Sequence, residues 1–201
     1  MTVPARPGTA CRAAQGSAAR IATWVVVGLI TVAAIVAVGS GAIGAPPAGA
    51  QSPGTPTRVL AVGDSVMEGA AGSIPGALPG REVLVDTEVS RSTSASAASA
   101  LGHGTDWDVV VIMLGHNDGG SPSVYQPAYR SLLDHLAGVP RVVVVTLHEV
   151  RPYYADVNAF LRSEAAGRAN VRVLDWNSVA AQSPGALAGD GLHLTSSGAS
   201  L

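Results

Sequence analysis

The segment "DVVVIMLGHND" (residues 108–118) has the pattern of a strand buried on both faces that ends in a polar turn. Its apolar residues are continuous rather than alternating, and most are β-branched, which is typical of a strand inside a parallel sheet. The runs "RVLAV" (58–62) and "RVVVVTL" (141–147) have the same pattern. These runs predict buried strands of one parallel sheet.

Further elements alternate with these three. Two more strand candidates are "EVLVDTEV" (82–89) and "VRVLDW" (171–176). One helix candidate begins at Ser65, and three more span 92–101, 123–138 and 156–168. Pro127 is expected to break the 123–138 helix near its start. Strands that alternate with helices predict an α/β domain with about five parallel strands and right-handed crossovers.

Polar side chains follow the predicted strands at the point where each strand ends. In an open parallel sheet, functional residues collect just beyond the carboxyl ends of the strands. The clusters that fall there are Gly63-Asp64-Ser65, Ser90-Arg91, Gly115 to Asp118, His148-Glu149, and Asp190 with His193. We therefore expect them to share one edge of the sheet.

An uncharged apolar segment lies near the start of the chain. Arg6, Arg12 and Arg20 precede residues 21–38, which would form roughly 27 Å of helix, close to the thickness of a bilayer core. The basic flank orients the N-terminus toward the cytoplasm. Ala48-Gly49-Ala50 has the pattern of a signal-peptide cleavage site. A cleaved signal peptide and an uncleaved signal anchor both fit this segment.

These features divide the chain into three parts. Residues 1–50 are the signal peptide or signal anchor, 51–57 a Pro/Gly linker, and 58–201 the folded domain. Both interpretations of the first part predict export, to a secreted or membrane-tethered position outside the cytoplasm. Three of the 12 basic residues precede residue 51 and all 14 acidic residues follow it, so the exported part carries a net charge near −5. That charge argues against nucleic-acid binding.

The composition excludes several kinds of chemistry. Every basic residue is arginine, so Schiff-base catalysis and a Ser–Lys dyad lack the amine that they need. Cys11 is the only cysteine, which excludes a disulfide within the chain and a cysteine-based zinc site. We expect no metal and no organic cofactor.

The residues at the sheet edge suggest nucleophilic catalysis. Ser65 follows a strand directly, but a serine hydroxyl needs a base, and histidine is the natural base near neutral pH. Asp190 and His193 are close enough in sequence for one loop to join them, so the carboxylate could fix the imidazole tautomer. Asn117 could stabilise the oxyanion of a tetrahedral intermediate.

Each of these residues also has a structural alternative. Ser65 could cap a helix together with Glu68 in a capping box. Asn117 and the residues after it could form only a turn, and so could Asp190-Gly191, with His193 a surface side chain. Four other histidines are rival bases, of which His135 falls inside a helix pattern: His103, His116, His135 and His148.

Three motifs carry a resemblance to a known family. "VGDSVMEG" (62–69), "LGHND" (114–118) and "DGLHLT" (190–195) resemble blocks I, III and V of the SGNH (GDSL) hydrolases over residues 58–198. The resemblance implies a flavodoxin-like, three-layer α/β sandwich and serine esterase activity. It implies Ser65 as nucleophile, His193 as general base and Asp190 as its orienting acid, with Asn117 and the Ser65 N–H as oxyanion donors. "VDTEVSRSTS" (85–94) also resembles SGNH domains associated with membrane acyltransferases.

Two features depart from the family pattern. Block II normally supplies a glycine whose N–H completes the oxyanion hole, and the nearest counterpart here is Ser90. The following Arg91 could contact an anionic or sugar part of the substrate, or form a surface ion pair. Family members also continue from block V into a full helix, whereas only "TSSGASL" (195–201) follows here. A shortened domain or a truncated sequence would leave apolar surface uncovered.

The sequence thus supports an exported serine esterase that hydrolyses carboxylic esters, with short acyl or O-acetyl groups, through an acyl-serine intermediate. The expected partner is a small-molecule or glycan ester, and the membrane is a second partner if the N-terminal segment stays uncleaved. One alternative is an O-acyltransferase or deacetylase acting on cell-envelope sugars. Another is a non-catalytic envelope-binding module, and a phosphate-binding domain is weaker because the first loop lacks a hydroxyl-rich glycine cradle.

Overall fold

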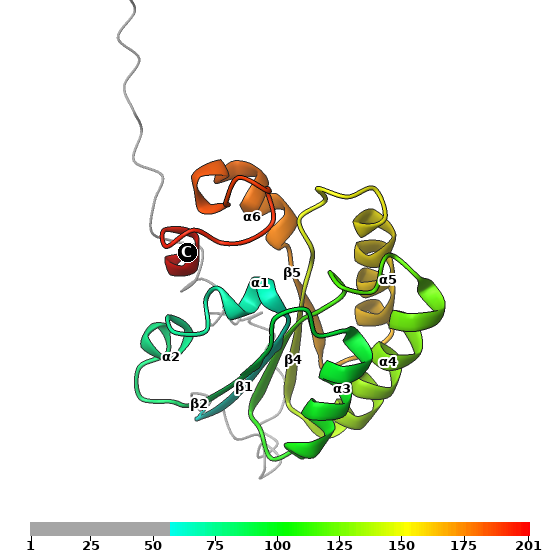
Figure 1. Cartoon of the computed structure of the whole chain (residues 1–201). Helices are drawn as coiled ribbons and strands as arrows, with labels where there is room; N and C mark the ends of the chain where they lie inside the picture. The colour runs from blue at the N-terminus through cyan, green and yellow to red at the C-terminus, as the bar shows by residue number, and fades with distance from the viewer. Residues whose placement is uncertain (1–56) are drawn as a thin grey trace, which may run out of the picture. The chain divides into compact units, whose positions relative to one another are not determined.

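The computed structural model describes residues 57–201 (Figure 1). The signal segment 1–50, its apolar run 21–38 and most of the linker lie outside the described residues. Within residues 57–201, no helix is long and apolar enough to cross a membrane.

The domain is built on a five-stranded parallel sheet. Its strands are β1 (Arg58–Gly63), β2 (Glu82–Thr87), β3 (Val109–Met113), β4 (Arg141–Val145) and β5 (Val171–Leu174). They are arranged in the order β2-β1-β3-β4-β5, and every neighbouring pair is parallel. This is the flavodoxin-like strand order, so the predicted fold class is confirmed. All the strands end on one edge of the sheet, which is where the polar clusters lie.

Three longer helices cover one face of the sheet (Figure 1). They are α3 (Thr93–Gly102), α4 (Pro122–His135) and α5 (Tyr154–Ala166). Aromatic rings fill the layer beneath α4 and α5, where Phe160 makes edge contacts with Tyr125 and Tyr129 at 5.4 and 6.0 Å between centroids. These rings, with the buried leucines of α4, account for much of the hydrophobic core.

The opposite face carries only short elements (Figure 1). These are α1 (Ser65–Glu68), α2 (Ile74–Ala77), α6 (Trp176–Gln182) and the 3₁₀ turns Pro184–Ala186 and Gly198–Ser200. The two helical layers and the sheet together form the expected three-layer sandwich. The second layer is thin because none of its elements exceeds seven residues.

Some predicted elements differ from those observed. The last strand ends at Leu174, because Asp175 caps α6 by accepting the Ser178 N–H at 3.3 Å, and Trp176 is therefore helical. The helices α2 and α6 were not predicted, since neither has a full helical period of apolar residues. Pro127 does not break α4, whose buried tyrosines and leucines hold the helix continuous through it.

Candidate active site

Ser65 is the first residue of α1, immediately after β1. The N-cap of this helix is Asp64, whose carboxylate accepts the Val66 N–H at 3.1 Å. The alternative in which Ser65 caps the helix with Glu68 is therefore wrong. The Ser65 side chain keeps its hydroxyl for another partner and lies at the carboxyl edge of the sheet, partly exposed.

His193 joins Ser65 to Asp190. Its Nε2 lies 3.0 Å from the Ser65 Oγ, and its Nδ1 lies 2.7 Å from the Asp190 Oδ2. An ionised carboxylate can only accept a hydrogen bond, so Nδ1 carries the proton in this pair. In the neutral ring Nε2 then has a free lone pair directed at the serine hydroxyl. This arrangement lets the imidazole take a proton from Ser65.

Asp190 is held as an anion by its own loop. Its Oδ1 accepts the backbone N–H of Leu192 at 2.9 Å and that of His193 at 3.1 Å. The hydrogen bond from the His193 side chain, followed by these two N–H groups, holds the pKa of Asp190 well below its usual range. Gly191 has a φ of 68°, which a turn here requires. The turn and the acid–base pair, treated above as alternatives, are the same structure.

The loop is anchored by the segment that precedes it. Leu187 and Leu194 form an antiparallel bridge, and the Thr195 N–H donates to the Ala186 carbonyl at 2.9 Å. The Thr195 hydroxyl also donates to the Gly185 carbonyl at 2.9 Å. The position of His193 is therefore set by a small hairpin rather than by a long helix after it.

The loops after β2 and β3 meet beside Ser65. Ser90 has a φ of 63° and is the only residue other than glycine with a positive φ among residues 57–201. The left-handed conformation costs a residue with a Cβ about 1–2 kcal/mol. A serine thus occupies the backbone conformation that glycine adopts without strain, at the position expected for the block II glycine.

Asn117 is exposed and contacts the same loop. Its Nδ2 donates to the Arg91 carbonyl at 3.1 Å. The amide nitrogen has a second hydrogen, and the bond to a carbonyl determines which end of the amide is the donor. Next to it, buried Asp118 accepts the Thr93 N–H at 3.1 Å and also the Thr93 hydroxyl. These bonds tie the loop after β3 to the start of α3.

Arg91 does not lie on the surface as either sequence interpretation expected. Its side chain is 8% exposed and its Nη1 lies 2.7 Å from the Asp86 Oδ1 in an internal ion pair. The guanidinium also donates to the Gly63 carbonyl at 3.2 Å and to the Ser96 hydroxyl at 2.9 Å. Its hydrogen-bonding groups are directed into the protein, so we do not assign Arg91 to substrate contact.

The four other histidines have partners or positions away from Ser65. His135 is exposed on α4. The other three are bonded to scaffold side chains: His103 to Asp86 at 3.1 Å, His116 to Asp64 at 2.8 Å and His148 to Asn177 at 3.1 Å. In the described part of the chain, His193 is the histidine that contacts the serine.

The sequence model of the GDSL-like lipase/acylhydrolase family matches residues 61–201, which is more than half of the chain. The chain belongs to the GDSL-like lipase/acylhydrolase family. The matched range contains the whole of the Ser65–His193–Asp190 arrangement.

Among relatives, the GDSL-like domain is similar to the peptidoglycan O-acetyltransferase OatA of Listeria monocytogenes. The two are 30% identical over 146 residues, which cover 71% of this chain but 22% of OatA. The chain thus spans about a fifth of the length of that curated relative.

Solved structures of other proteins have a similar fold. The C-terminal catalytic domain of Streptococcus pneumoniae OatA is 26% identical, with a TM-score of 0.60 over 72% of this chain and 87% of that domain. A family 3 carbohydrate esterase from Clostridium thermocellum has a TM-score of 0.55 at 15% identity, over 72% of this chain and 90% of the esterase. The likeness to this esterase shows a shared fold.

One pair in the GDSL-like domain was not predicted as part of the site. Asp64 is fully buried and accepts hydrogen bonds from the His116 Nδ1 at 2.8 Å and from the His116 N–H at 3.4 Å. Asp64 precedes Ser65, and His116 precedes Asn117, so the pair joins the two loops. In the sequence, each of the two residues stands next to a candidate site residue. Their contact is visible only in the folded structure.

The described residues of the GDSL-like domain contain no cluster of three His, Cys, Asp or Glu side chains arranged to hold a metal ion. The side chains around Ser65 are instead engaged with one another, as described above.

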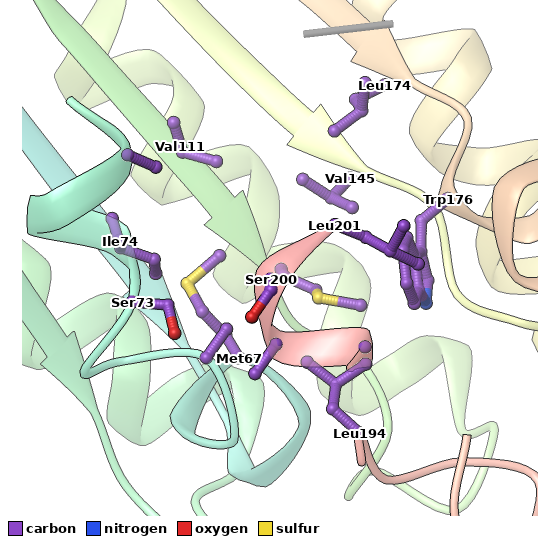
Figure 2. Close-up of a pocket in the computed structure, with 15 residues that line it drawn as sticks. Met67, Ser73, Ile74, Val111, Val145, Leu174, Trp176, Leu194, Ser200 and Leu201 are labelled. Atoms are coloured by element: carbon purple, nitrogen blue, oxygen red, sulfur yellow. The ribbon is translucent and has the colours of Figure 1, made fainter. Parts of the chain in front are cut away.

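An apolar groove lies on the thinly covered face of the sheet (Figure 2). It has a volume of about 470 Å³ and is lined by residues that include Met67, Val111, Val145, Leu174 and Leu201. Ser65, Asn117 and His193 are not among its lining residues. Met67 of α1 and Leu194, the neighbour of His193, do line it, so the groove adjoins the segments that carry Ser65 and His193. The uncovered apolar surface expected from the sequence is therefore present on this face of the sheet.

Proposed function

We propose that this chain is an exported serine esterase that hydrolyses short acyl or O-acetyl esters through an acyl-serine intermediate. The observation that carries the proposal is the continuous series of hydrogen bonds from Ser65 through His193 to Asp190, at 3.0 and 2.7 Å. A non-catalytic binding module has no need for this arrangement. Export rests on the apolar segment 21–38 and its basic flank.

In the first half of the reaction, the Ser65 Oγ forms a bond to the ester carbonyl carbon while His193 Nε2 takes the hydroxyl proton. The negative charge on the carbonyl oxygen would be stabilised by the N–H groups of Ser65 and Ser90 and by the Asn117 amide. The bond to the alcohol oxygen then breaks, and the imidazolium returns its proton to that oxygen. Asp190 stays ionised throughout and stabilises the imidazolium.

The second half repeats these steps with water. His193 takes a proton from a water molecule as its oxygen attacks the acyl carbon, and the proton is returned to the Ser65 Oγ as the acid leaves. No metal or organic cofactor is required at any step.

Acyl transfer to a sugar of the cell envelope is the second candidate. The likeness to OatA favours it, since that relative is named as a peptidoglycan O-acetyltransferase. A sugar hydroxyl would replace water in the second half, with the same acyl-serine intermediate. Removal of acetyl groups from such sugars would use the hydrolytic route.

The test uses residues 51–201 expressed as the exported domain. We expect hydrolysis of p-nitrophenyl acetate that decreases as the acyl chain lengthens, and labelling of Ser65 by a fluorophosphonate ester. Ser65→Ala and His193→Ala should each abolish turnover, while the exposed His135→Ala should not. An active Ser65→Ala enzyme would refute the assignment. Added glycan acceptors distinguish the candidates, because transfer that outruns hydrolysis identifies a transferase.

A further inference from the structure

Arg91 lies next to each of the three segments that carry the proposed oxyanion donors. Its guanidinium donates to the carbonyl of Gly63, two residues before Ser65. Its own carbonyl accepts the Asn117 Nδ2–H at 3.1 Å. Its backbone follows Ser90 directly. One residue therefore joins the end of β1 to the loops after β2 and β3 at the carboxyl edge of the sheet.

The guanidinium is fixed by four hydrogen bonds. Its Nη1 and Nη2 donate to the carboxylate and to the carbonyl of Asp86, both at 2.7 Å, and its Nε donates to the Ser96 hydroxyl at 2.9 Å. The fourth is the bond to Gly63. A planar guanidinium carries five N–H donors on three nitrogens, whereas an ammonium group has only three donors on one nitrogen and cannot make all four bonds.

The loop that Arg91 holds contains a backbone conformation that does not persist unaided. Ser90 has a φ of 63°, and an L-residue with a Cβ is held in that region only when its surroundings determine it. Its restraints are the turn bond from the Arg91 N–H to the Glu88 carbonyl at 3.5 Å and the side-chain contacts of Arg91, since the Ser90 side chain is itself exposed and the structure gives it no hydrogen bond. The direction of the Ser90 N–H thus depends on the contacts of its neighbour.

We propose that Arg91 is a positioning residue. Its buried guanidinium bonds to Asp86, Gly63 and Ser96 are called the clamp below. The clamp holds the Ser90 N–H and the Asn117 amide in the geometry that receives the oxyanion. This inference rests on the proposed function. The oxyanion that these donors stabilise develops only in the transition state, so we expect the effect of Arg91 on kcat rather than on substrate affinity. The departure from glycine at position 90 makes the clamp necessary.

The first test is Arg91→Lys, which keeps the positive charge but replaces the planar guanidinium with an ammonium group. We expect kcat for p-nitrophenyl acetate to fall about 10- to 100-fold, which does not exceed the loss of about 10²–10³-fold for complete removal of one oxyanion donor, with KM within about threefold of the wild type. Arg130→Lys is the matched control, because Arg130, whose side chain is half exposed, pairs with Glu164 between α4 and α5. It should leave both constants unchanged.

The second test asks whether the clamp acts through Ser90. In a Ser90→Gly background the left-handed conformation costs nothing. The fold-decrease in kcat caused by Arg91→Lys should therefore be several times smaller with glycine at position 90 than with serine. Amide hydrogen exchange of residues 88–93 should also become faster in Arg91→Lys and stay unchanged in Arg130→Lys. Ser96→Ala removes one contact of the clamp and should produce the same changes at smaller amplitude, even if Arg91→Lys does not fold.

A kcat retained within threefold in Arg91→Lys, or an equal loss in both backgrounds, would overturn the proposal. A change confined to KM would also overturn it and would assign Arg91 to substrate contact. Failure of the proposed function looks different, because the wild type would then show no turnover above Ser65→Ala. In that case the hydrogen-exchange comparison still decides whether the clamp exists.

Discussion

Asp190 has two roles in one turn. It accepts two backbone N–H groups through Oδ1, which shapes the loop, and the His193 ring through Oδ2, which sets the tautomer. Asp190→Asn keeps the size of the side chain and removes the charge that stabilises an imidazolium. We expect kcat to fall about 10²–10⁴-fold with the fold intact. Ester hydrolysis and far-UV circular dichroism measure the two effects, and a fall of less than tenfold would contradict the assigned role.

The Asp64–His116 pair is a second feature at the scale of single residues. The Asp64 side chain has no exposed surface and that of His116 is 2% exposed. His116→Ala removes the side-chain hydrogen-bond partner of a buried carboxylate, which costs about 1–3 kcal/mol. Urea denaturation should show this loss, whereas the exposed His135→Ala should change stability by less than about 0.5 kcal/mol. Equal stability of the two variants would refute the structural role of the pair.

At the scale of elements, α1 depends on the glycine that ends β1. A Cβ on Gly63 would lie 2.3 Å from the Met67 Cβ, which no real contact allows. Gly63→Ala must push α1 away from β1 and carry Ser65 out of reach of His193. We expect kcat to fall at least about 100-fold, because misplacement of a reacting group by 1 Å has that effect. Gly72→Ala is the control, since its Cβ meets nothing within 4 Å.

Asp86, near the end of β2, makes the stability of the fold depend on pH. Burial alone would raise the pKa of Asp86, but hydrogen bonds from Arg91 and Ser99 outweigh it and hold that pKa below the ordinary value. A carboxyl with a lowered folded-state pKa stabilises the fold above about pH 4, and this stabilisation is lost as the pH falls through the folded-state pKa. The Tm should therefore fall below pH 4, and Asp86→Asn should make that fall shallower. An unchanged slope would contradict this account.

At the scale of the whole molecule, the two faces of the sheet are covered unequally. Leu174 is 40% exposed in the apolar groove, whereas Leu84 is 37% exposed on β2 and is not one of the groove's lining residues. We expect the native domain to bind the dye ANS saturably, because exposed apolar surface takes up such dyes. Leu174→Gln should weaken this binding and Leu84→Gln should not. Equal effects of the two variants would place the dye elsewhere.

Much of this domain could be predicted from local patterns. All five strands were expected within about two residues of their observed ends, because three are continuous apolar runs typical of a parallel sheet and the other two are short segments rich in valine and leucine. Ser65, Asn117, Asp190 and His193 were expected at one sheet edge, since parallel strands bring their carboxyl ends together. The short helices α2 and α6 could not be predicted, because four to seven residues do not establish a period.

The order of the strands, the family resemblance and the identity of the residues at the sheet edge could all be inferred from the amino-acid sequence. These depend on side-chain type and spacing along the chain. The inward direction of Arg91, the pairing of Asp64 with His116 and the glycine-like conformation of Ser90 became evident only in the folded domain. Each joins residues from different loops or depends on a backbone angle. Such contacts are determined by the packing of the loops against one another, and local sequence does not encode that packing.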